Sequence, residues 1–417
     1  MSYFSFNDRD VEKLLIVGYG ATGKSVCNFI KKFTRTFVDI SQSDEDFINY
    51  DLDAYDLIVV SPGIPINKNP YKNLQNLKDK IISDIDIFYQ CVKDRNIKTI
   101  AVTGSNGKST VVTMLDFVLK NIGYKSVLVG NIGTPPLDIV NEDFEFCILE
   151  LSSFQIDLLK SARFDLGCVI NVSPDHLDRY DSFVEYKQSK LNLANFSKDF
   201  FVYDVDNTGI KYTQEYQIIK GCIYKGAVKL LDIAETNLFG QHNLENIVVV
   251  LKIFDKFGLN INKSISAIKK FKGLEHRCQV VKKINDITYI DDSKGTNVGA
   301  TVAAINSITS SKNIILLLGG LAKGGDFSLM IHALEKYVKY VFIYGADKEY
   351  IENSIKNHCK YELCNNMKQA FELASNKARE NDIVLLSPAC ASFDEFSGYA
   401  HRGEVFKNLV YQLDKNK

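Results

Sequence analysis

Tryptophan is absent from this 417-residue sequence, a compositional bias that says nothing about function. An excess of either charge is also missing, because 50 basic residues face 51 acidic ones. The sequence therefore gives no electrostatic reason to expect nucleic acid or a membrane surface as a partner. No uncharged apolar run reaches the length of a membrane span, and the polar residues 1–10 lack the apolar segment of a secretion signal.

Paired cysteine motifs are missing as well. The nine cysteines form neither a C-x-x-C pair nor a zinc-binding spacing. We therefore expect reduced thiols in a cytoplasmic protein. The apolar fraction of 46% is ordinary for a globular protein with large cores. The length suggests about two to four domains.

The most informative stretch is residues 103–110, TGSNGKST, between an apolar run at 99–102 and a helical pattern at 111–119. A glycine loop between a strand and a helix leaves N–H groups at the helix N-terminus, where the helix dipole favours anions. Lys108 adds a charge for a terminal phosphate, and Ser109 a hydroxyl for magnesium. Val102 replaces a glycine of the strict phosphate-loop pattern, so the loop is a shortened variant. The alternative is a glycine turn that binds nothing.

A second glycine turn lies near the N-terminus. Gly18, Gly20 and Gly23 follow a predicted strand at 13–17 and precede a predicted helix at 24–32. Asp39 ends the next strand, about 20 residues on, which matches the dinucleotide fingerprint. The pattern predicts a phosphate-bearing ligand at the helix N-terminus, with Asp39 near a sugar or base.

Apolar strands and helical patterns alternate along the rest of the chain, which predicts an α/β protein with mainly parallel sheets. The predicted strands are at 36–38, 56–60, 99–102, 126–129, 146–149, 167–172, 287–290, 313–318, 341–344 and 382–386. Short alternating runs between 200 and 231 predict antiparallel strands. A charged linker at 93–98 and a hinge at Gly273 divide the chain into three domains, 1–90, 91–273 and 274–417.

The motifs together resemble the Mur ligase family in order and spacing, over essentially the whole chain. They are TGSNGKST at 103–110, GNIG at 130–133, LELSSFQ at 149–155, NVSPDHLDRY at 171–180, HNLEN at 242–246, HR at 276–277, DDSKGTN at 291–297 and SPACAS at 387–392. The resemblance implies an N-terminal Rossmann-like UDP-binding domain and a central mononucleotide-binding ATPase domain. It also implies a Rossmann-like C-terminal domain that binds the incoming amino acid and closes on ATP.

The resemblance further implies an ATP-dependent acid–D-amino-acid ligase of peptidoglycan precursor synthesis. The implied substrates are UDP-N-acetylmuramoyl-L-alanine and D-glutamate, joined through an acyl phosphate with release of ADP and phosphate. The implied cofactors are ATP, two Mg²⁺ ions and a carbamylated Lys190. We expect a monomer.

Site residues follow from the matching positions. For catalysis the resemblance implies Lys108, Glu150, His176 and Lys190, and for the metal ions Ser109, Glu150, His176 and Lys190. For ATP it implies Gly104, Ser105, Asn106, Gly107, Lys108, Ser109, Thr110, Asn243, Asn246, Arg277 and Asp292. For the UDP substrate it implies Gly20, Ala21, Thr22, Asp39, Ser61, Gly63 and Asn131. For D-glutamate it implies Lys294, Thr296, Lys323, Ser392 and Phe393.

Some positions depart from the family pattern, and other functions stay open. Ile40 and Ser41 replace a Thr-Arg pair associated with uracil, while Phe393 and Tyr399 stand where Leu and Phe are usual. Another Mur-type or folylpolyglutamate-type ligase is one alternative, although the Asp-Asn-Pro-Arg motif of the diaminopimelate-adding type is missing. A nicotinamide-dependent oxidoreductase would use the first glycine turn. A nucleotide-binding module without catalysis is the third alternative.

Overall fold

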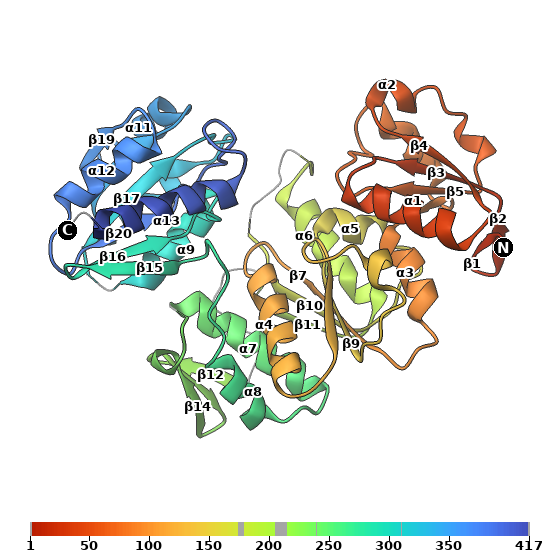
Figure 1. Cartoon of the computed structure of the whole chain (residues 1–417), viewed down its shortest axis with the longest axis horizontal. Coiled ribbons are helices and arrows are strands. Elements are labelled where there is room, and N and C mark those ends of the chain that lie inside the picture. Colours follow the sequence, from red (N-terminus) through yellow and green to blue (C-terminus); the bar gives the residue numbers. More distant parts are fainter. Residues whose placement is uncertain (1, 174–178, 205–214, 239, 310, 416–417) are drawn as a thin grey trace. The chain divides into compact units, whose positions relative to one another are not determined.

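The computed structural model describes residues 2–173, 179–204, 215–238, 240–309 and 311–415 (Figure 1). The chain forms two compact units. The first unit contains Met1–Tyr216 and Asn246–Ile268, and the second contains Gln217–Glu245 and Lys269–Lys417. Mainly parallel sheets flanked by helices make up both units, as the alternating sequence pattern predicts.

The N-terminal part of the first unit is a four-stranded parallel sheet in the order β4-β3-β5-β6. Its strands are β3 (Lys13–Val17), β4 (Phe37–Ser41), β5 (Leu57–Val60) and β6 (Ile81–Ile82). Its helices are α1 (Ala21–Phe33), α2 (Asp44–Phe47) and α3 (Asp84–Val92). An antiparallel hairpin of β1 (Phe4–Phe6) and β2 (Arg9–Val11), which the sequence analysis missed, precedes the sheet. Strand β3 is buried from its second residue on, which explains its clear apolar signal.

A five-stranded parallel sheet in the order β11-β10-β7-β9-β8 forms the centre of the first unit. Its strands are β7 (Lys98–Thr103), β8 (Ser126–Gly130), β9 (Phe146–Glu150), β10 (Phe164–Asn171) and β11 (Ser197–Asp204). Its helices are α4 (Lys108–Asn121), α5 (Ser153–Leu158), α6 (Phe183–Leu191), α7 (Gln241–Lys256) and α8 (Ile261–Ile268). From β7 the chain continues to strands on one side of the sheet, β8 and β9, and then to strands on the other side, β10 and β11. The point between β7 and β10 is therefore the topological switch point of the sheet. Sheets of this kind bind ligands in the crevice at the carboxyl ends of the two strands that border this point.

The prediction of antiparallel strands between residues 200 and 231 is wrong for its first part. Strand β11 pairs in parallel with β10, because helix α6 connects the two strands as a crossover. The later part is confirmed for β13 (Cys222–Lys225) and β14 (Val228–Asp232), which pair antiparallel in a three-stranded sheet with β12 (Tyr216–Ile219).

The C-terminal sheet has the order β15-β16-β20-β17-β18-β19, and only β15 pairs antiparallel. Its strands are β15 (Gln279–Ile284), β16 (Ile287–Asp291), β17 (Ile314–Gly319), β18 (Val338–Tyr344), β19 (Tyr361–Leu363) and β20 (Ile383–Leu386). Its helices are α9 (Val298–Ile308), α10 (Ile331–Tyr337), α11 (Lys348–Ile355), α12 (Met367–Lys377) and α13 (Tyr399–Lys415).

Two separate apolar layers cover the faces of this sheet. In β17, Leu316 packs into a core with α9, α10 and α11, whereas Leu317 packs into a core with α12 and α13. Successive side chains of a strand point to opposite faces, so a continuous apolar run serves both layers. The sheet is therefore doubly wound, and its loops at the carboxyl ends of the strands are free to carry polar side chains.

In the described part of the chain, no helix is both long enough and apolar enough to cross a membrane.

Candidate active site

The glycine loop of residues 104–107 connects β7 to α4, as predicted. Gly107 caps α4 with a φ of 83°, a left-handed backbone that favours glycine. A Cβ at Gly107 would also lie 2.5 Å from Asn246 Oδ1 of α7. Side chains larger than glycine are therefore excluded by strain and by space. No side chain of the described residues caps this helix, and the N–H groups at a helix N-terminus are suited to bind an anion.

The end of β10 holds the loop in place. Asn171 accepts the backbone N–H of Asn106 at 2.9 Å through Oδ1 and donates to the Asn106 carbonyl at 3.1 Å. Ser105 Oγ donates to the Ser173 carbonyl at 3.0 Å and accepts the Ser173 N–H at 3.0 Å. Sequence reasoning quoted the motif that contains Asn171 but gave the residue no role. Its signal was its place at the carboxyl end of a strand, where sheets of this kind bind ligands.

Lys108 lies over the loop. Its Nζ donates to the carbonyls of Gly104, at 2.6 Å, and Ser105, at 3.1 Å. The buried Ser109 and Thr110 follow in the first turn of α4. A positive charge, helix N–H groups and hydroxyls therefore meet at one loop, which is the arrangement that binds nucleotide phosphates.

Glu150 ends β9, beside the loop's own strand, and its side chain is 1% exposed. Asn131 Nδ2 donates to Glu150 Oε1 at 2.9 Å. Glu150 Oε2 is buried and has no hydrogen-bond partner among the residues that the structure describes, and the same holds for Thr103 Oγ1. A buried carboxylate oxygen without a partner is costly unless a cation meets it. The free oxygen of Glu150 therefore fits a magnesium ion, which prefers oxygen ligands.

Lys190 of α6 is 2% exposed, and its Nζ lies 4.7 Å from the ring centroid of Tyr186. Lys190 is therefore buried and not an ordinary exposed surface lysine. His176, the other predicted ligand, lies outside the described residues. Their meeting at one metal site stays a prediction.

The glycines of the N-terminal turn allow a close approach of strand and helix. A Cβ at Gly23 would lie 2.1 Å from the Gly18 carbonyl oxygen, so only glycine allows α1 to pack this closely. Gly20 caps α1, and the space around it is open, with Ala21 and Thr22 in the first turn. Ser61 Oγ donates to the Gly18 carbonyl at 2.8 Å.

Asp39 has a protein partner in this region. Tyr55 donates its hydroxyl to Asp39 Oδ2 at 2.6 Å, and burial together with this carboxylate raises the pKa of Tyr55. The acid that the fingerprint predicts for a ribose thus already accepts one hydrogen bond from the fold. Gly63 follows Ser61 in the loop after β5. Asn131, predicted for the same substrate, is exposed and donates to Glu150 of the central sheet.

In the second unit, Asp292 is buried at the end of β16. Ser387 Oγ donates to its Oδ2 at 2.6 Å, and the Cys278 N–H donates to its Oδ1 at 3.1 Å. Burial raises the pKa of Asp292 to about 7, although these hydrogen bonds and the charge of Arg277 oppose the shift. Asn243 and Asn246 are buried on α7. How the residues predicted for ATP in the two units meet stays a prediction.

The residues predicted for D-glutamate follow three strands whose loops are joined. The Ala389 N–H donates to the Gly295 carbonyl, which links the loops after β20 and β16. Leu321 and Ala391 exchange two backbone hydrogen bonds of 2.9 Å, which link the loops after β17 and β20. These three loops therefore lie side by side at one edge of the parallel sheet. They carry Lys294 and Thr296, Lys323, and Ser392 and Phe393, respectively after β16, β17 and β20.

These side chains differ in their surroundings. Lys294 Nζ lies 3.8 Å from the ring centroid of Tyr399, so the aromatic residue that departs from the family pattern contacts a predicted site residue. Ser392 is buried, whereas Phe393 is 69% exposed. Lys323 is exposed and has a φ of 50°.

Arg402 of α13 was missed by the sequence analysis. It is fully buried, donates from Nε to Ser293 Oγ at 3.0 Å, and donates from Nη2 to the carbonyls of Ser293 and Cys390. The arginine thereby joins the loops after β16 and β20. Its position in a helix far along the chain gave no local signal.

One other group of possible metal ligands occurs in the described ranges, formed by Glu275, His276 and Glu404. Lys407 Nζ lies 3.5 Å from Glu275 Oε1 and 3.0 Å from Glu404 Oε1. An ammonium group already supplies the positive charge here, so we assign no metal to this cluster.

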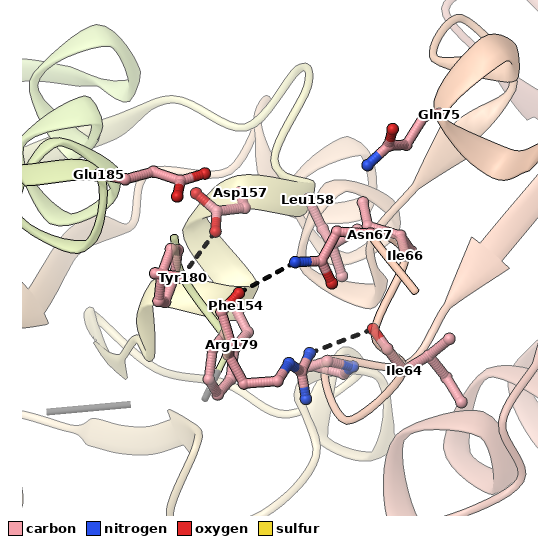
Figure 2. A pocket seen from close by; sticks show the side chains of 11 residues that line it. Ile64, Ile66, Asn67, Gln75, Phe154, Asp157, Leu158, Arg179, Tyr180 and Glu185 are labelled. Atoms are coloured by element: carbon pink, nitrogen blue, oxygen red, sulfur yellow. Dashed lines mark hydrogen bonds between the residues drawn. The ribbon is translucent and has the colours of Figure 1, made fainter. Parts of the chain in front are cut away.

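A pocket in the first unit lies between the loop after β5 and the helices α5 and α6 (Figure 2). Ile64, Ile66 and Leu158 supply apolar walls, and Asp157 and Glu185 supply carboxylates. The pocket therefore adjoins the loop that carries Ser61 and Gly63.

Comparisons with known proteins agree with this architecture. Residues 102–227 match the Mur ligase middle domain, and residues 276–390 match the Mur ligase, glutamate ligase domain. A UDP-N-acetylmuramoylalanine–D-glutamate ligase of Francisella tularensis subsp. novicida (strain U112) is 73% identical over 415 residues, with all of both chains covered. The ligase of the same name from F. tularensis subsp. tularensis (strain WY96-3418) is 72% identical over the same length, again with both chains fully covered.

Solved structures show the same fold at low identity. The UDP-N-acetylmuramate-alanine ligase MurC of Thermotoga maritima superposes with a TM-score of 0.61 at 16% identity, over 97% of this chain and 100% of that one. The MurF ligase of T. maritima in complex with ADP superposes with a TM-score of 0.59 at 15% identity, over 99% and 98% of the two chains. Together with the relatives above, these matches show that the chain belongs to the Mur ligase family.

Proposed function

We propose that the protein is the ATP-dependent ligase that joins D-glutamate to UDP-N-acetylmuramoyl-L-alanine in peptidoglycan precursor synthesis. The observation that carries this proposal is the 73% identity, over the full length of both chains, to a ligase with that name. The ADP complex of a family member with the same fold supports ATP as the energy source. The oxidoreductase alternative leaves the loop of residues 104–110 without a role.

The reaction needs ATP because a carboxylate is a poor acyl donor. Oxide would have to leave if an amine attacked the carboxylate directly. Transfer of the γ-phosphoryl group to the carboxylate oxygen of the alanyl residue gives an acyl phosphate and ADP. The amine of D-glutamate then attacks the acyl carbon, phosphate leaves, and the amine proton passes to solvent or a base.

We propose that Lys108 and the N-terminus of α4 bind the phosphates, together with the other residues of the loop, Gly104, Ser105, Asn106, Gly107, Ser109 and Thr110. Fixed positive charge and N–H donors stabilise the charge that develops during phosphoryl transfer. Ser109 and Glu150 would hold one magnesium ion, and His176 and Lys190 a second. Bound magnesium would neutralise the phosphate oxygens and orient them. The orphaned oxygen of Glu150 supports the first of these sites.

Lys190 would serve the metal as a carbamate. A lysine ammonium beside a divalent cation is repelled by it, whereas the carbamate formed from the neutral amine and carbon dioxide, with loss of a proton, is an anionic oxygen ligand. The near-complete burial of Lys190 supports this proposal, because burial disfavours an ammonium.

Substrate residues are proposed by domain. Gly20, Ala21, Thr22, Asp39, Ser61, Gly63 and Asn131 would bind the UDP substrate. Asn243, Asn246, Arg277 and Asp292 would complete the ATP site. Lys294, Thr296, Lys323, Ser392 and Phe393 would bind D-glutamate, whose two carboxylates need cations and N–H or O–H donors. We further propose three domains with limits near residues 90 and 273, and a monomer that acts in the cytoplasm.

The proposal is tested by measuring phosphate release from ATP with UDP-N-acetylmuramoyl-L-alanine and a panel of amino acids. We expect D-glutamate to be strongly preferred over L-glutamate, L-alanine and diaminopimelate, with one phosphate per amide formed. Omitting the UDP substrate is the control for uncoupled hydrolysis. Equal rates with all amino acids would overturn the assignment to D-glutamate and leave a generic ligase.

A further inference from the structure

Arg179 reaches from the central sheet's side of the first unit to the loop after β5 (Figure 2). Its Nη1 donates to the Gly63 carbonyl at 3.1 Å, and its Nη2 donates to the Ile64 carbonyl at 3.3 Å. The guanidinium carbon lies 4.3 Å from the ring centroid of Phe154 of α5. In the opposite direction, Asn67 Nδ2 donates to the Arg179 carbonyl at 3.0 Å. The side chain and the backbone of Arg179 therefore both form hydrogen bonds with the loop after β5.

The fastened loop is also tied to the N-terminal glycine turn. Ser61 donates its N–H to the Val17 carbonyl at 2.9 Å and its hydroxyl to the Gly18 carbonyl at 2.8 Å. A Cβ at Gly18 would lie 3.1 Å from Ile64 Cγ1, so Ile64 packs directly on the turn. The loop is therefore held on one side by the glycine turn and on the other side by Arg179.

The residue after Arg179 is fixed to helix α6. Tyr180 is buried and donates its hydroxyl to Asp157 Oδ2 at 2.8 Å, and the same hydroxyl lies 3.2 Å from Ser189 Oγ. Ser189 precedes Lys190 in α6. A continuous set of contacts therefore runs from the glycine turn, through Ser61 and Arg179, to the helix that carries Lys190.

We propose that Arg179 is a positioning residue that sets the loop of Ser61 and Gly63, and with it the bound UDP substrate, relative to the reacting groups on the central sheet. This inference rests on the proposed function. A guanidinium suits the task because its planar fork donates to two carbonyls while its face stacks on an aromatic ring. A lysine ammonium can replace the charge but not this combined geometry.

The test compares the KM values for the UDP substrate and for ATP in Arg179→Ala, Arg179→Lys and a control, Arg163→Ala. Arg163 is a matched control because it makes the same two kinds of contact. Its guanidinium carbon lies 5.5 Å from the ring centroid of Phe196, and its Nη1 donates to the Ala162 carbonyl. Its contacts stay within the central part of the unit.

We expect Arg179→Ala to raise the KM for UDP-N-acetylmuramoyl-L-alanine about tenfold, because two charge-assisted hydrogen bonds are lost. The KM for ATP should change less than about twofold. Arg179→Lys should remain impaired, and added guanidinium should restore part of the activity of Arg179→Ala. Arg163→Ala should leave both KM values unchanged. If Arg179→Ala does not fold, Asn67→Ala, which removes the other contact to this loop, should show a smaller rise confined to the UDP substrate.

An unchanged KM for the UDP substrate, an equal rise in both KM values, or full rescue by Arg179→Lys would overturn the inference while the ligase activity of the wild type stands. A wild-type protein that does not ligate D-glutamate and does not bind the UDP substrate in a calorimetric titration would instead overturn the proposed function, and this inference with it.

Discussion

The first unit contains two glycine turns of the same local design, which differ in what surrounds them. Both connect a buried parallel strand to a helix whose N-terminus has no side-chain cap. At the N-terminal turn, Asp39 accepts a hydrogen bond from the Tyr55 hydroxyl. A Cβ placed at Gly20 would have no atom of the described residues within 4 Å, so the space there is open. At the central turn, Lys108 lies over the loop and Glu150 buries an oxygen that lacks a partner in the described structure.

This difference shows that a glycine turn alone indicates a phosphate-bearing ligand, not catalysis. The N-terminal turn offers N–H donors and space, which are enough to bind a nucleotide. The central turn adds a positive charge held over the loop and a buried carboxylate oxygen without a partner in the described structure, and metal-assisted phosphoryl transfer uses groups of both kinds. We therefore propose that the UDP substrate binds at the first turn and ATP at the second.

The largest expected effect follows from Lys108→Ala. Removing one preorganised charge from the site of phosphoryl transfer should lower kcat/KM by about 100- to 1,000-fold. Lys24→Ala, in the first helix after the N-terminal turn, is the matched control and should change kcat/KM little. Steady-state phosphate release from both purified variants gives the answer. Near-normal turnover of a folded Lys108→Ala protein would break the comparison.

Glu150→Gln should separate activity from stability. We expect a loss of activity of about 100-fold and a higher magnesium requirement, because the neutral amide is a weaker ligand. The melting temperature should stay the same or rise, since a buried charge with one unpartnered oxygen is removed. Magnesium titrations of activity, together with thermal unfolding of the ligand-free proteins, provide the two readouts. An active variant with ordinary magnesium dependence would show that Glu150 is structural.

Lys190→Ala tests whether an anionic group completes the central site. We expect activity to fall about 10- to 100-fold and a small added carboxylic acid, such as formate, to restore part of it. Lys187→Ala, on the same helix, serves as the control and should need no added acid. Full activity of Lys190→Ala without added acid would remove the carbamate from the mechanism.

The smallest expected effect is on the pH dependence of stability and concerns Asp292. This carboxylate is buried like that of Glu150, but both of its oxygens accept hydrogen bonds. Its pKa is raised to about 7 in the folded protein, from an ordinary value near 4. Between these two pH values the folded state holds a proton that the unfolded state releases, so this group makes the free energy of unfolding fall as pH rises. Above about pH 7 its penalty is constant, and below about pH 4 it vanishes.

Asp292→Asn should therefore lose less stability than the wild type when the pH is raised from about 4 to about 7. Denaturant unfolding of both proteins across this range measures the difference. Parallel pH dependence of the two proteins would show that Asp292 does not titrate in this window.

Most of the fold was predictable because its strands are buried on both faces. Strand β7, for example, has five buried residues in a row, and the apolar run at 99–102 located it. The hairpin of β1 and β2 was not predictable, since its three-residue strands are too short to show a period. The predicted antiparallel direction of β11 was wrong. This edge strand has partly exposed residues, so its sequence alternates in polarity as in an antiparallel strand.

The site was predictable where the chemistry lies in one motif. Lys108 begins α4 directly after the glycine loop and Glu150 ends β9, so each residue lies inside a short motif that the sequence displays. The contacts of Asn171 with Asn106, and of Arg179 with Gly63, connect residues far apart in the chain. Such contacts depend on how strands and loops are arranged in space, which a local pattern does not record.

The division of labour between the two glycine turns is tested most directly by equilibrium binding to two single variants. Gly20→Val places bulk in open space at the mouth of the first turn, and Lys108→Ala removes the charge of the second. Calorimetric titrations should show that Gly20→Val loses affinity for UDP-N-acetylmuramoyl-L-alanine but binds a non-hydrolysable ATP analogue with magnesium normally. Lys108→Ala should show the reverse pattern. If either variant weakens both ligands equally, or if the pattern is exchanged, the assignment of UDP to the first turn and ATP to the second is contradicted.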